Sequence, residues 1–376
     1  MKTPIHPGNK IGGPWAVIVL AVALLCTSAP VTAAEQPKKV IYETDMCLDV
    51  DDVGGLAMLH ALADKGEVEI LAVTFNEVHP SGPVAIDAIN TWYGRGEIPV
   101  GIYNESLAAP DTSKYLGPVA AFPHDLTRET APTALEVYRK VLAAQPDKSV
   151  TIISVGFLNN LHDLLKADPD LVGKKVKELV VMGARNNDGF NLSRHDLVAQ
   201  SEYVIRHWPT PLVISSHGGG VRTGSRLSGT AAGNPVREAY YQWFDQSYEG
   251  RSSWDQVAVL YGVRGLRNYF SEIATGTGRL SNGFEWQMQP GHRSYLKAKL
   301  SDQEFVDIIE PRMIQPPGIQ LAGGMDTHQP VQAQGPGEEP PAGAPYSPYP
   351  ATNALSAISN RGGPSTAQNM KQKGAP

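Results

Sequence analysis

Apolar residues along this chain fall into two kinds of segment, short β-branched runs and longer runs with helical spacing. The strand-like runs are 40–42, 69–75, 98–103, 150–156, 178–183 and 211–215. Helical spacing follows most of them, at 56–62, 84–93, 134–144, 158–165, 197–207 and 257–261. Repeated strand–helix units with continuously apolar strands predict an α/β fold in a single domain, with a doubly wound, mostly parallel sheet and helices on both faces.

Polar residues gather where these predicted strands end. They include the acids of 45–52, Asn76, Gly156 with Asn159 and Asn160, the run 183–191, and Ser216 with His217. In open parallel sheets, ligands bind beyond the carboxyl ends of the strands. We therefore expect a site at this edge, with the polar stretch 107–130 as a loop that could fold over it.

The first residues have the pattern of a secretory signal peptide. Lys2 and Lys10 precede an apolar run that ends near Cys26, and small residues follow up to Ala34. The apolar run is short for a transmembrane span. We predict that residues 1–34 are a signal peptide and that the mature protein is exported, periplasmic or secreted, without a membrane span.

The last residues differ in composition from the centre of the chain. Residues 317–376 are rich in Pro, Gly, Ala, Ser and Gln, and such a segment lacks the apolar surface that would offset its ordering entropy. We predict a disordered tail there and one globular domain over residues 35–316. The net charge of -6 argues against nucleic acid as a partner. The oligomeric state is left open, a homo-oligomer included.

The chain has two cysteines, Cys26 and Cys47. Cleavage of the signal peptide would remove the first, so no intrachain disulfide is expected despite export. Cys47 lies within the acidic stretch, but no local signature marks it as a nucleophile. We interpret it as a small buried thiol.

The stretch 40–56 carries the strongest chemical signal. Four carboxylates, those of Asp45, Asp49, Asp51 and Asp52, follow a β-branched run within eight positions and precede a helical pattern. Crowded carboxylates repel one another unless protons or a cation intervene, and Ca²⁺ or Mg²⁺ accepts such oxygen ligands. Helix N-capping explains one or two acids, Asp49 first among them. The set of four favours a metal or catalytic role.

Other candidates carry less weight alone. Asp255 precedes the helical run 257–261 and is explained by N-terminal capping, unless the strand-end site needs one more oxygen ligand. His195 and His217 stand near predicted strand ends, where an acid for a leaving group would be useful. A hydrogen-bonded structural histidine is the simpler interpretation of each.

Several motifs together resemble the inosine-uridine nucleoside hydrolase family. The stretch ETDMCLDVDDVGGL at 43–56 is similar to the aspartate cluster that follows the first strand of that family. Further similar segments are VTFN at 73–76, VGFLNN at 155–160, MGA at 182–184, GFN at 189–191, DLVA at 196–199 and WD at 254–255. The resemblance covers nearly all of 38–316, so residues 35–316 are predicted to form a nucleoside hydrolase-like catalytic domain.

The resemblance implies Ca²⁺-dependent hydrolysis of the N-glycosidic bond of a ribonucleoside or a related N-riboside. It implies that Ca²⁺ is bound by Asp45, Asp52, Asp255 and the backbone carbonyl of Val155. Asp45 would also act as the general base toward a water that Ca²⁺ activates. Nearby carboxylates suit the oxocarbenium-like transition state of such reactions, and a bound cation lowers the pKa of its water.

The resemblance also assigns the substrate contacts. Asp51, Asn76 and Asn191 would hold ribose hydroxyls. Trp254 departs from the family pattern, but its side chain can stack on an aromatic ring of the substrate. The partner is thus a small molecule, and nucleoside salvage is the purpose that the resemblance suggests.

Departures from the family pattern leave alternatives open. Glu43 replaces an aspartate and Cys47 a glycine, while Gly189 and Trp254 stand where the family has a sugar-binding glutamate and a histidine near the leaving base. A ribose- or nucleoside-binding protein that retains the Ca²⁺ site but has weak catalysis is the second hypothesis. A phosphatase of the haloacid dehalogenase type is disfavoured. That family has a second acid two positions after the first, whereas Met46 and Cys47 follow Asp45 here.

Overall fold

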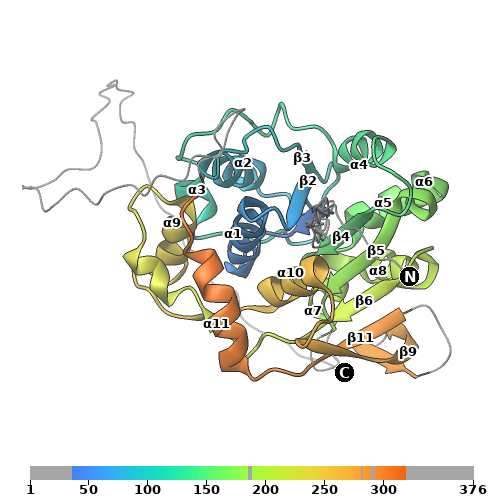
Figure 1. The fold of residues 1–376 in the computed structure, drawn as a ribbon. Coiled ribbons are helices and arrows are strands. Elements are labelled where there is room, and N and C mark those ends of the chain that lie inside the picture. Colours follow the sequence, from blue (N-terminus) through green and yellow to red (C-terminus); the bar gives the residue numbers. More distant parts are fainter. Residues whose placement is uncertain (1–35, 185–188, 281–282, 289–292, 319–376) are drawn as a thin grey trace, which may run out of the picture. The chain divides into compact units, whose positions relative to one another are not determined.

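The computed structural model describes residues 36–184, 189–280, 283–288 and 293–318, which form a nine-stranded sheet between two layers of helices (Figure 1). The predicted signal peptide at 1–34, the predicted tail beyond residue 318, and residues 185–188 of the strand-end run lie outside the described residues. No helix of the described ranges has the length and hydropathy of a membrane span.

The strands of the large sheet are β1 (Lys38–Thr44), β2 (Val68–Phe75), β3 (Val100–Ile102), β4 (Val150–Ser154), β5 (Val176–Met182), β6 (Leu212–Ser215), β9 (Phe270–Leu280), β10 (Phe284–Gln287) and β11 (Arg293–Ala298). Two short strands, β7 (Arg222–Thr223) and β8 (Arg251–Ser252), form a separate antiparallel ribbon.

The α-helices are α1 (Asp51–Asp64), α2 (Gly82–Trp92), α3 (Leu116–Val119), α4 (Ala134–Ala143), α5 (Asn159–Ala167), α6 (Pro169–Lys175), α7 (Phe190–Ser193), α8 (Val198–His207), α9 (Pro235–Trp243), α10 (Trp254–Arg264) and α11 (Asp302–Met313). Short 3₁₀ segments are η2 (Arg194–Asp196) and η3 (Ser225–Gly229).

The sheet has the strand order β10-β9-β11-β6-β5-β4-β1-β2-β3. Every neighbouring pair from β11 to β3 is parallel, whereas β9 and β10 are antiparallel additions at one edge. The prediction of a mostly parallel α/β sheet is confirmed. Strand order reverses around β1, with β2 on one side and β4 on the other. Such a reversal leaves a crevice at the carboxyl ends of the strands, where ligands bind.

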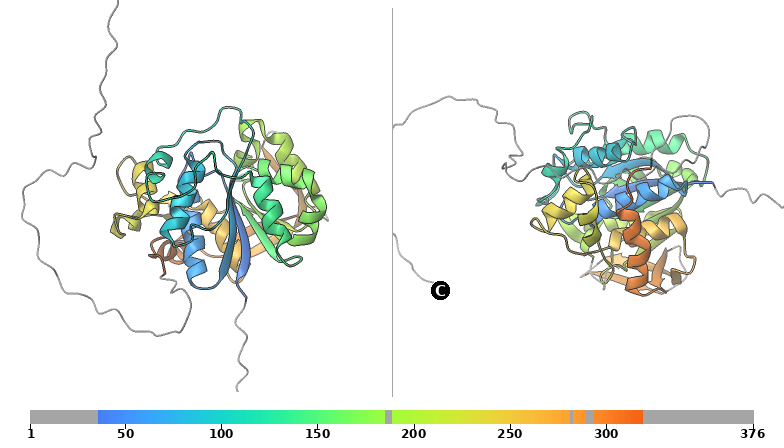
Figure 2. Two further views of the ribbon diagram at one scale, coloured as in Figure 1. Left: turned by 90° about the horizontal axis from the view of Figure 1, so that it is seen from above. Right: turned by 60° about the vertical axis from the view of Figure 1, so that its left-hand side comes forward.

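Helices cover both faces because the strands bury side chains on both. Val40 and Tyr42 of β1 belong to the core under α1, α10 and α11, whereas Ile41 belongs to the core under α4, α5 and α8. This alternation follows from the two-residue period of a strand. In Figure 2, left, the strands run between these two helical layers. Both cores therefore brace β1, the strand that ends at the acidic cluster.

The described residues after Arg264 show structure that the apolar pattern did not indicate. Strand β9 contains the sequence Thr-Gly-Thr-Gly at 275–278, without the β-branched run of the other strands. It is held in the sheet by backbone pairing with β11 on one side and β10 on the other. Helix α11 begins at a capping box in which the Ser301 hydroxyl accepts from the Glu304 N–H.

A buried histidine in α1 makes the stability of the fold depend on pH. His60 stacks on Tyr93 with ring centroids 4.5 Å apart, and its Nε2 lies 2.9 Å from Asn90 Oδ1. Burial lowers the pKa of His60 to about 3. The unfolded chain takes up this proton near pH 6.5 while the folded protein does not, so stability that is present above that pH is lost as the pH falls.

We therefore predict that acidification removes a stability advantage that wild type has over a His60→Gln variant. Between pH 7 and pH 5 the difference in unfolding free energy between the two proteins should shrink by about 2 kcal/mol. The reason is that pH 5 lies about 1.5 units below the pKa of His60 in the unfolded chain, and each unit costs about 1.4 kcal/mol. Urea denaturation at both pH values measures it, and carboxylate titrations cancel in the difference. A gap that stays constant would contradict the prediction.

Candidate functional site

The acidic cluster is set by the end of β1 and the start of α1. Asp45 follows the strand directly, and Asp51 and Asp52 are the first residues of the helix. The N-cap is Val50, without a side-chain cap, so the interpretation of Asp49 as an N-cap is wrong. The carboxylates are therefore not used for capping.

These acids line a cavity of about 190 Å³ at the carboxyl ends of the parallel strands. Its walls come from the acidic turn, β5, α7, β8 and the start of α10, with the residues Asp45, Asp49, Asp51, Asp52, Val155, Met182, Gly183, Ala184, Phe190, Asn191, Arg251, Trp254 and Asp255. Ligand pockets commonly measure roughly 300–1,000 Å³, so this cavity suits a sugar-sized group better than a large ligand.

Two glycines allow the elements of the site to approach closely. A Cβ on Gly156 would lie 2.5 Å from the Asp45 backbone nitrogen and 2.7 Å from Asn76 Oδ1. A Cβ on Gly55 would lie 2.5 Å from the Tyr42 hydroxyl and 3.4 Å from Asp255 Cβ. The first glycine lets β4 end against the acidic turn, and the second lets α10 bring Asp255 to α1.

Burial raises the pKa values of the clustered acids. Asp45, Asp52 and Asp255 have pKa values well above the usual range, first because they are buried and then because neighbouring aspartates repel the charged form. The same causes raise the pKa of Asp51 to about 7, although Arg251 opposes them. Protein groups therefore neutralise the cluster only in part, and protons or a cation must supply the rest.

The oxygen atoms present fit a hard divalent cation. Asp255 is buried, and among the described residues its Oδ1 has no hydrogen-bond partner. Asp52 Oδ1 accepts one hydrogen bond, from the Thr44 hydroxyl at 2.5 Å, which orients that carboxylate. Buried carboxylate and carbonyl oxygens are the ligands that Ca²⁺ and Mg²⁺ prefer. Asp255 is not the N-cap of α10, because Ser253 holds that position. Its side chain lines the cavity instead.

The predicted contacts around β4 lie partly in the cavity. Val155 and Asn191 both line it, and Asn191 Nδ2 donates to the Val155 carbonyl at 2.6 Å. Asn76 lies deeper, behind Gly156, where its Nδ2 donates to Glu43 Oε1 at 3.1 Å and to the Phe157 carbonyl at 2.7 Å. Asn76 is fully buried and does not line the cavity.

Arg251 and Arg194 contact acids of the site, although no sequence motif indicated either residue. Arg251 Nη2 donates to Asp49 Oδ2 at 2.7 Å, and its Nε lies 3.3 Å from Asp51 Oδ1. Its guanidinium lies over the rings of Trp243 and Trp254, at 5.1 and 4.9 Å. Arg194 Nη1 lies 3.9 Å from Asp45 Oδ2. Because these arginines come from distant segments, spacing along the chain could not reveal them.

The remaining candidates do not provide ligand atoms to the cavity. His217 Nε2 lies 3.0 Å from Asp302 Oδ1, and His217 does not line the cavity. Cys47 is a buried free thiol, and burial together with the charges of Glu77 and Asp111 raises its pKa, so it stays protonated. The loop 107–130 reaches the site, since the Tyr115 hydroxyl donates to the Asp49 carbonyl at 2.6 Å.

Comparison with solved structures places this fold among the nucleoside hydrolases. An inosine-guanosine nucleoside hydrolase superposes with a TM-score of 0.58 at 16% identity, covering 74% of this chain and 98% of that one. The inosine-uridine preferring nucleoside hydrolase from Bacillus anthracis gives 0.57 at 18% identity, covering 73% and 99%. The type III effector protein XopQ complexed with adenosine diphosphate ribose gives 0.54 at 14% identity, covering 74% and 93%.

At these identities the likeness shows the fold, and the chain has the nucleoside hydrolase-like fold that its motifs resemble. No protein-family model matches the chain, and no curated protein matches it. The similarity thus lies in backbone arrangement and in a few motifs rather than in overall sequence.

Because the buried acids repel one another, we predict that removing one of their charges stabilises the metal-free protein. In EDTA, an Asp52→Asn variant should be more stable than wild type, and more so at pH 8 than at pH 5, since a raised carboxyl pKa costs stability as the pH rises above the unfolded value. With a divalent cation at about 100 times its dissociation constant, wild type should gain about 2.7 kcal/mol and the order should reverse.

Thermal and urea unfolding of both proteins, with EDTA or with Ca²⁺ as the probe, measure these effects. The amide can still accept the Thr44 hydrogen bond, so the substitution changes charge with little change in packing. Equal stabilisation of both proteins by the cation would contradict a role of Asp52 in binding it.

Proposed function

We propose that this protein is a Ca²⁺-dependent hydrolase that cleaves the N-glycosidic bond of a ribonucleoside or a related N-riboside. The observation that carries the proposal is the convergence of Asp45, Asp51, Asp52 and Asp255 in one sugar-sized cavity, on a fold shared with nucleoside hydrolases. Asp45, Asp51 and Asp52 come from the end of β1 and the start of α1, whereas Asp255 comes from α10, about 200 residues later in the sequence.

Asp45, Asp52, Asp255 and the Val155 carbonyl would hold the Ca²⁺. When bound, Ca²⁺ would supply a Lewis acid that lowers the pKa of a water and orients vicinal hydroxyls. Asp45 accepts the proton of the attacking water, and Arg194 at 3.9 Å limits the rise in its pKa. Asp51 accepts hydrogen bonds from ribose hydroxyls, and the Asn191 amide exchanges hydrogen bonds with them. The carboxylates stabilise positive charge on the sugar ring.

Trp254 forms part of the wall and offers an aromatic face for a planar leaving group. Asn76 acts from behind, because it orients Glu43 and the turn at Phe157. An Asn76 contact with ribose requires a shift of this side chain toward the cavity.

A second function is favoured by one observation, the position of Arg251. Its Nε lies 3.3 Å from Asp51 Oδ1, so the guanidinium competes with a ribose hydroxyl for that carboxylate. A ribose- or nucleoside-binding protein that keeps the Ca²⁺ site with weak catalysis accommodates this contact. One protein of similar fold, the type III effector XopQ, forms a complex with adenosine diphosphate ribose, which is a ribose-containing ligand.

We also propose export after removal of residues 1–34, which the Lys2-to-Ala34 pattern supports. N-terminal sequencing of the protein from the culture medium and from the periplasm tests it.

The test of hydrolysis is the release of free ribose from a panel of ribonucleosides. Wild type should release ribose with Ca²⁺ and lose the activity in EDTA, and Asp45→Asn should lower kcat/KM by about 10²–10⁴-fold because a general base is removed. The matched control is Asp245→Asn, which removes a carboxylate from an exposed pair with Lys114 and should change nothing.

Absence of ribose release from every ribonucleoside would refute ribonucleoside hydrolysis. Calorimetry then separates the remaining functions: Ca²⁺-dependent binding of ribose or nucleoside without turnover supports the binding protein.

A further inference from the structure

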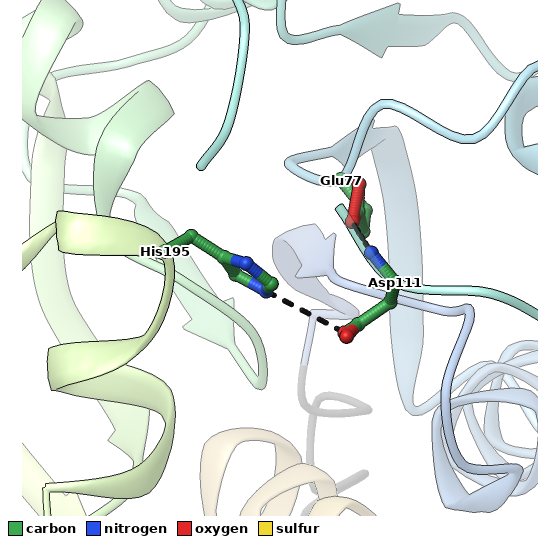
Figure 3. A group of neighbouring side chains, drawn as sticks. All are labelled: Glu77, Asp111 and His195. Carbon is green, nitrogen blue, oxygen red and sulfur yellow. Dashed lines mark hydrogen bonds and ion pairs between the residues drawn. The ribbon is translucent and has the colours of Figure 1, made fainter. Parts of the chain in front are cut away.

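A second group of ligating side chains lies beside the cavity, on the far side of Arg194. Glu77, Asp111 and His195, all within the described ranges, each place one ligand atom within 4.8 Å of the other two. Glu77 follows β2, Asp111 lies in the loop 107–130, and His195 is in η2 (Figure 3). None of the three lines the cavity described above.

The imidazole of His195 supplies an independent sign of a ligand. Its side chain is 5% exposed, and Nε2 is buried without a hydrogen-bond partner among the described residues. Nδ1 lies 2.8 Å from the Ala108 carbonyl, which can only accept, so Nδ1 carries the proton. In the neutral ring, Nε2 then carries a lone pair, and it lies 3.5 Å from Asp111 Oδ2. Figure 3 shows the ring turned toward Asp111, with this contact dashed.

A lone pair facing a carboxylate oxygen is repulsive unless a positive charge lies between them. Metal-ligating histidines have this arrangement, with the other ring nitrogen donating to a backbone carbonyl and fixing the tautomer. Phe157 packs edge-on against the ring at 4.7 Å between centroids and holds its orientation.

The two carboxylates are also preoriented. Glu77 Oε1 accepts from the Asp111 N–H at 2.6 Å, and Glu77 Oε2 accepts from the Val78 N–H. Arg194 Nη2 contacts Asp111 Oδ2, and this single guanidinium cannot neutralise both Asp111 and Glu77, so a net negative charge remains. Each carboxylate oxygen has a further lone pair for a ligand bond.

We propose that Glu77, Asp111 and His195 bind a divalent transition-metal ion at a site separate from the Asp45 cavity. One imidazole nitrogen with two carboxylate oxygens suits Zn²⁺ or Mn²⁺ better than an all-oxygen ion such as Ca²⁺. The bound ion joins the end of β2, the loop 107–130 and η2. It thereby fixes Arg194, which contacts Asp111, next to Asp45.

The test is Zn²⁺ binding by the full chain after chelator treatment and dialysis, by isothermal titration with elemental analysis of the retained metal. Wild type and Asp45→Asn should both bind one Zn²⁺ at this site. His195→Ala and Asp111→Asn should bind it at least about 10–100-fold more weakly, because loss of even an outer-shell partner costs that much. His217→Ala is the matched control and should bind as wild type does, since His217 pairs with Asp302 elsewhere.

Co²⁺ substitution gives a readout that does not depend on affinity. Visible absorption bands of Co²⁺ should appear with wild type and Asp45→Asn and be absent with His195→Ala, while circular dichroism verifies that each variant is folded. Equal Zn²⁺ binding by wild type and His195→Ala would overturn the proposal. Absence of Zn²⁺ binding by wild type would also overturn it, and would indicate a protonated His195 in an ion pair with Asp111.

Discussion

The repulsion among buried carboxylates at the end of β1 is the constraint on which the site depends. Asp45, Asp52 and Asp255 are brought together by two cores that hold β1, α1 and α10 rigidly, so the acids cannot relieve their repulsion by moving apart. Glycines at 55 and 156 permit this approach, and burial then raises the pKa values of these three carboxyl groups. A fold that places such a cost at the strand ends is ready to gain free energy from a divalent cation.

The same constraint explains which parts of the site could be predicted from the sequence. Asp45, Asp51 and Asp52 are close in the chain, and Val155 and Asn191 follow strands whose apolar pattern was evident, so topology alone brought them to one edge. Arg194 and Arg251 could not be predicted, because they pair with the acids from distant segments that carry no periodic pattern. The Thr-Gly-rich β9 was missed for a related reason, since pairing with β11 stabilises it rather than a local propensity.

One wall of the cavity beside the clustered acids is aromatic. Trp254 and the exposed ring of Phe190 give this wall an aromatic character. Arg194 lies over Phe190 at 4.6 Å and bridges from Asp45 to the Glu77–Asp111–His195 group. The charge balance of the cavity is therefore linked to a second polar group behind it, through a single guanidinium.

We infer that the buried acids hold protons until a cation replaces them. Isothermal titration of Ca²⁺ into the metal-free protein at pH 7, in buffers of different ionisation enthalpy, measures the protons released on binding. We predict a clear buffer dependence that corresponds to at least about one proton per Ca²⁺, because cation binding requires deprotonated carboxylates and burial raises the pKa values of Asp45, Asp52 and Asp255 well above the usual range. Binding heats that are the same in all buffers would show that the acids are already ionised, and would contradict this inference.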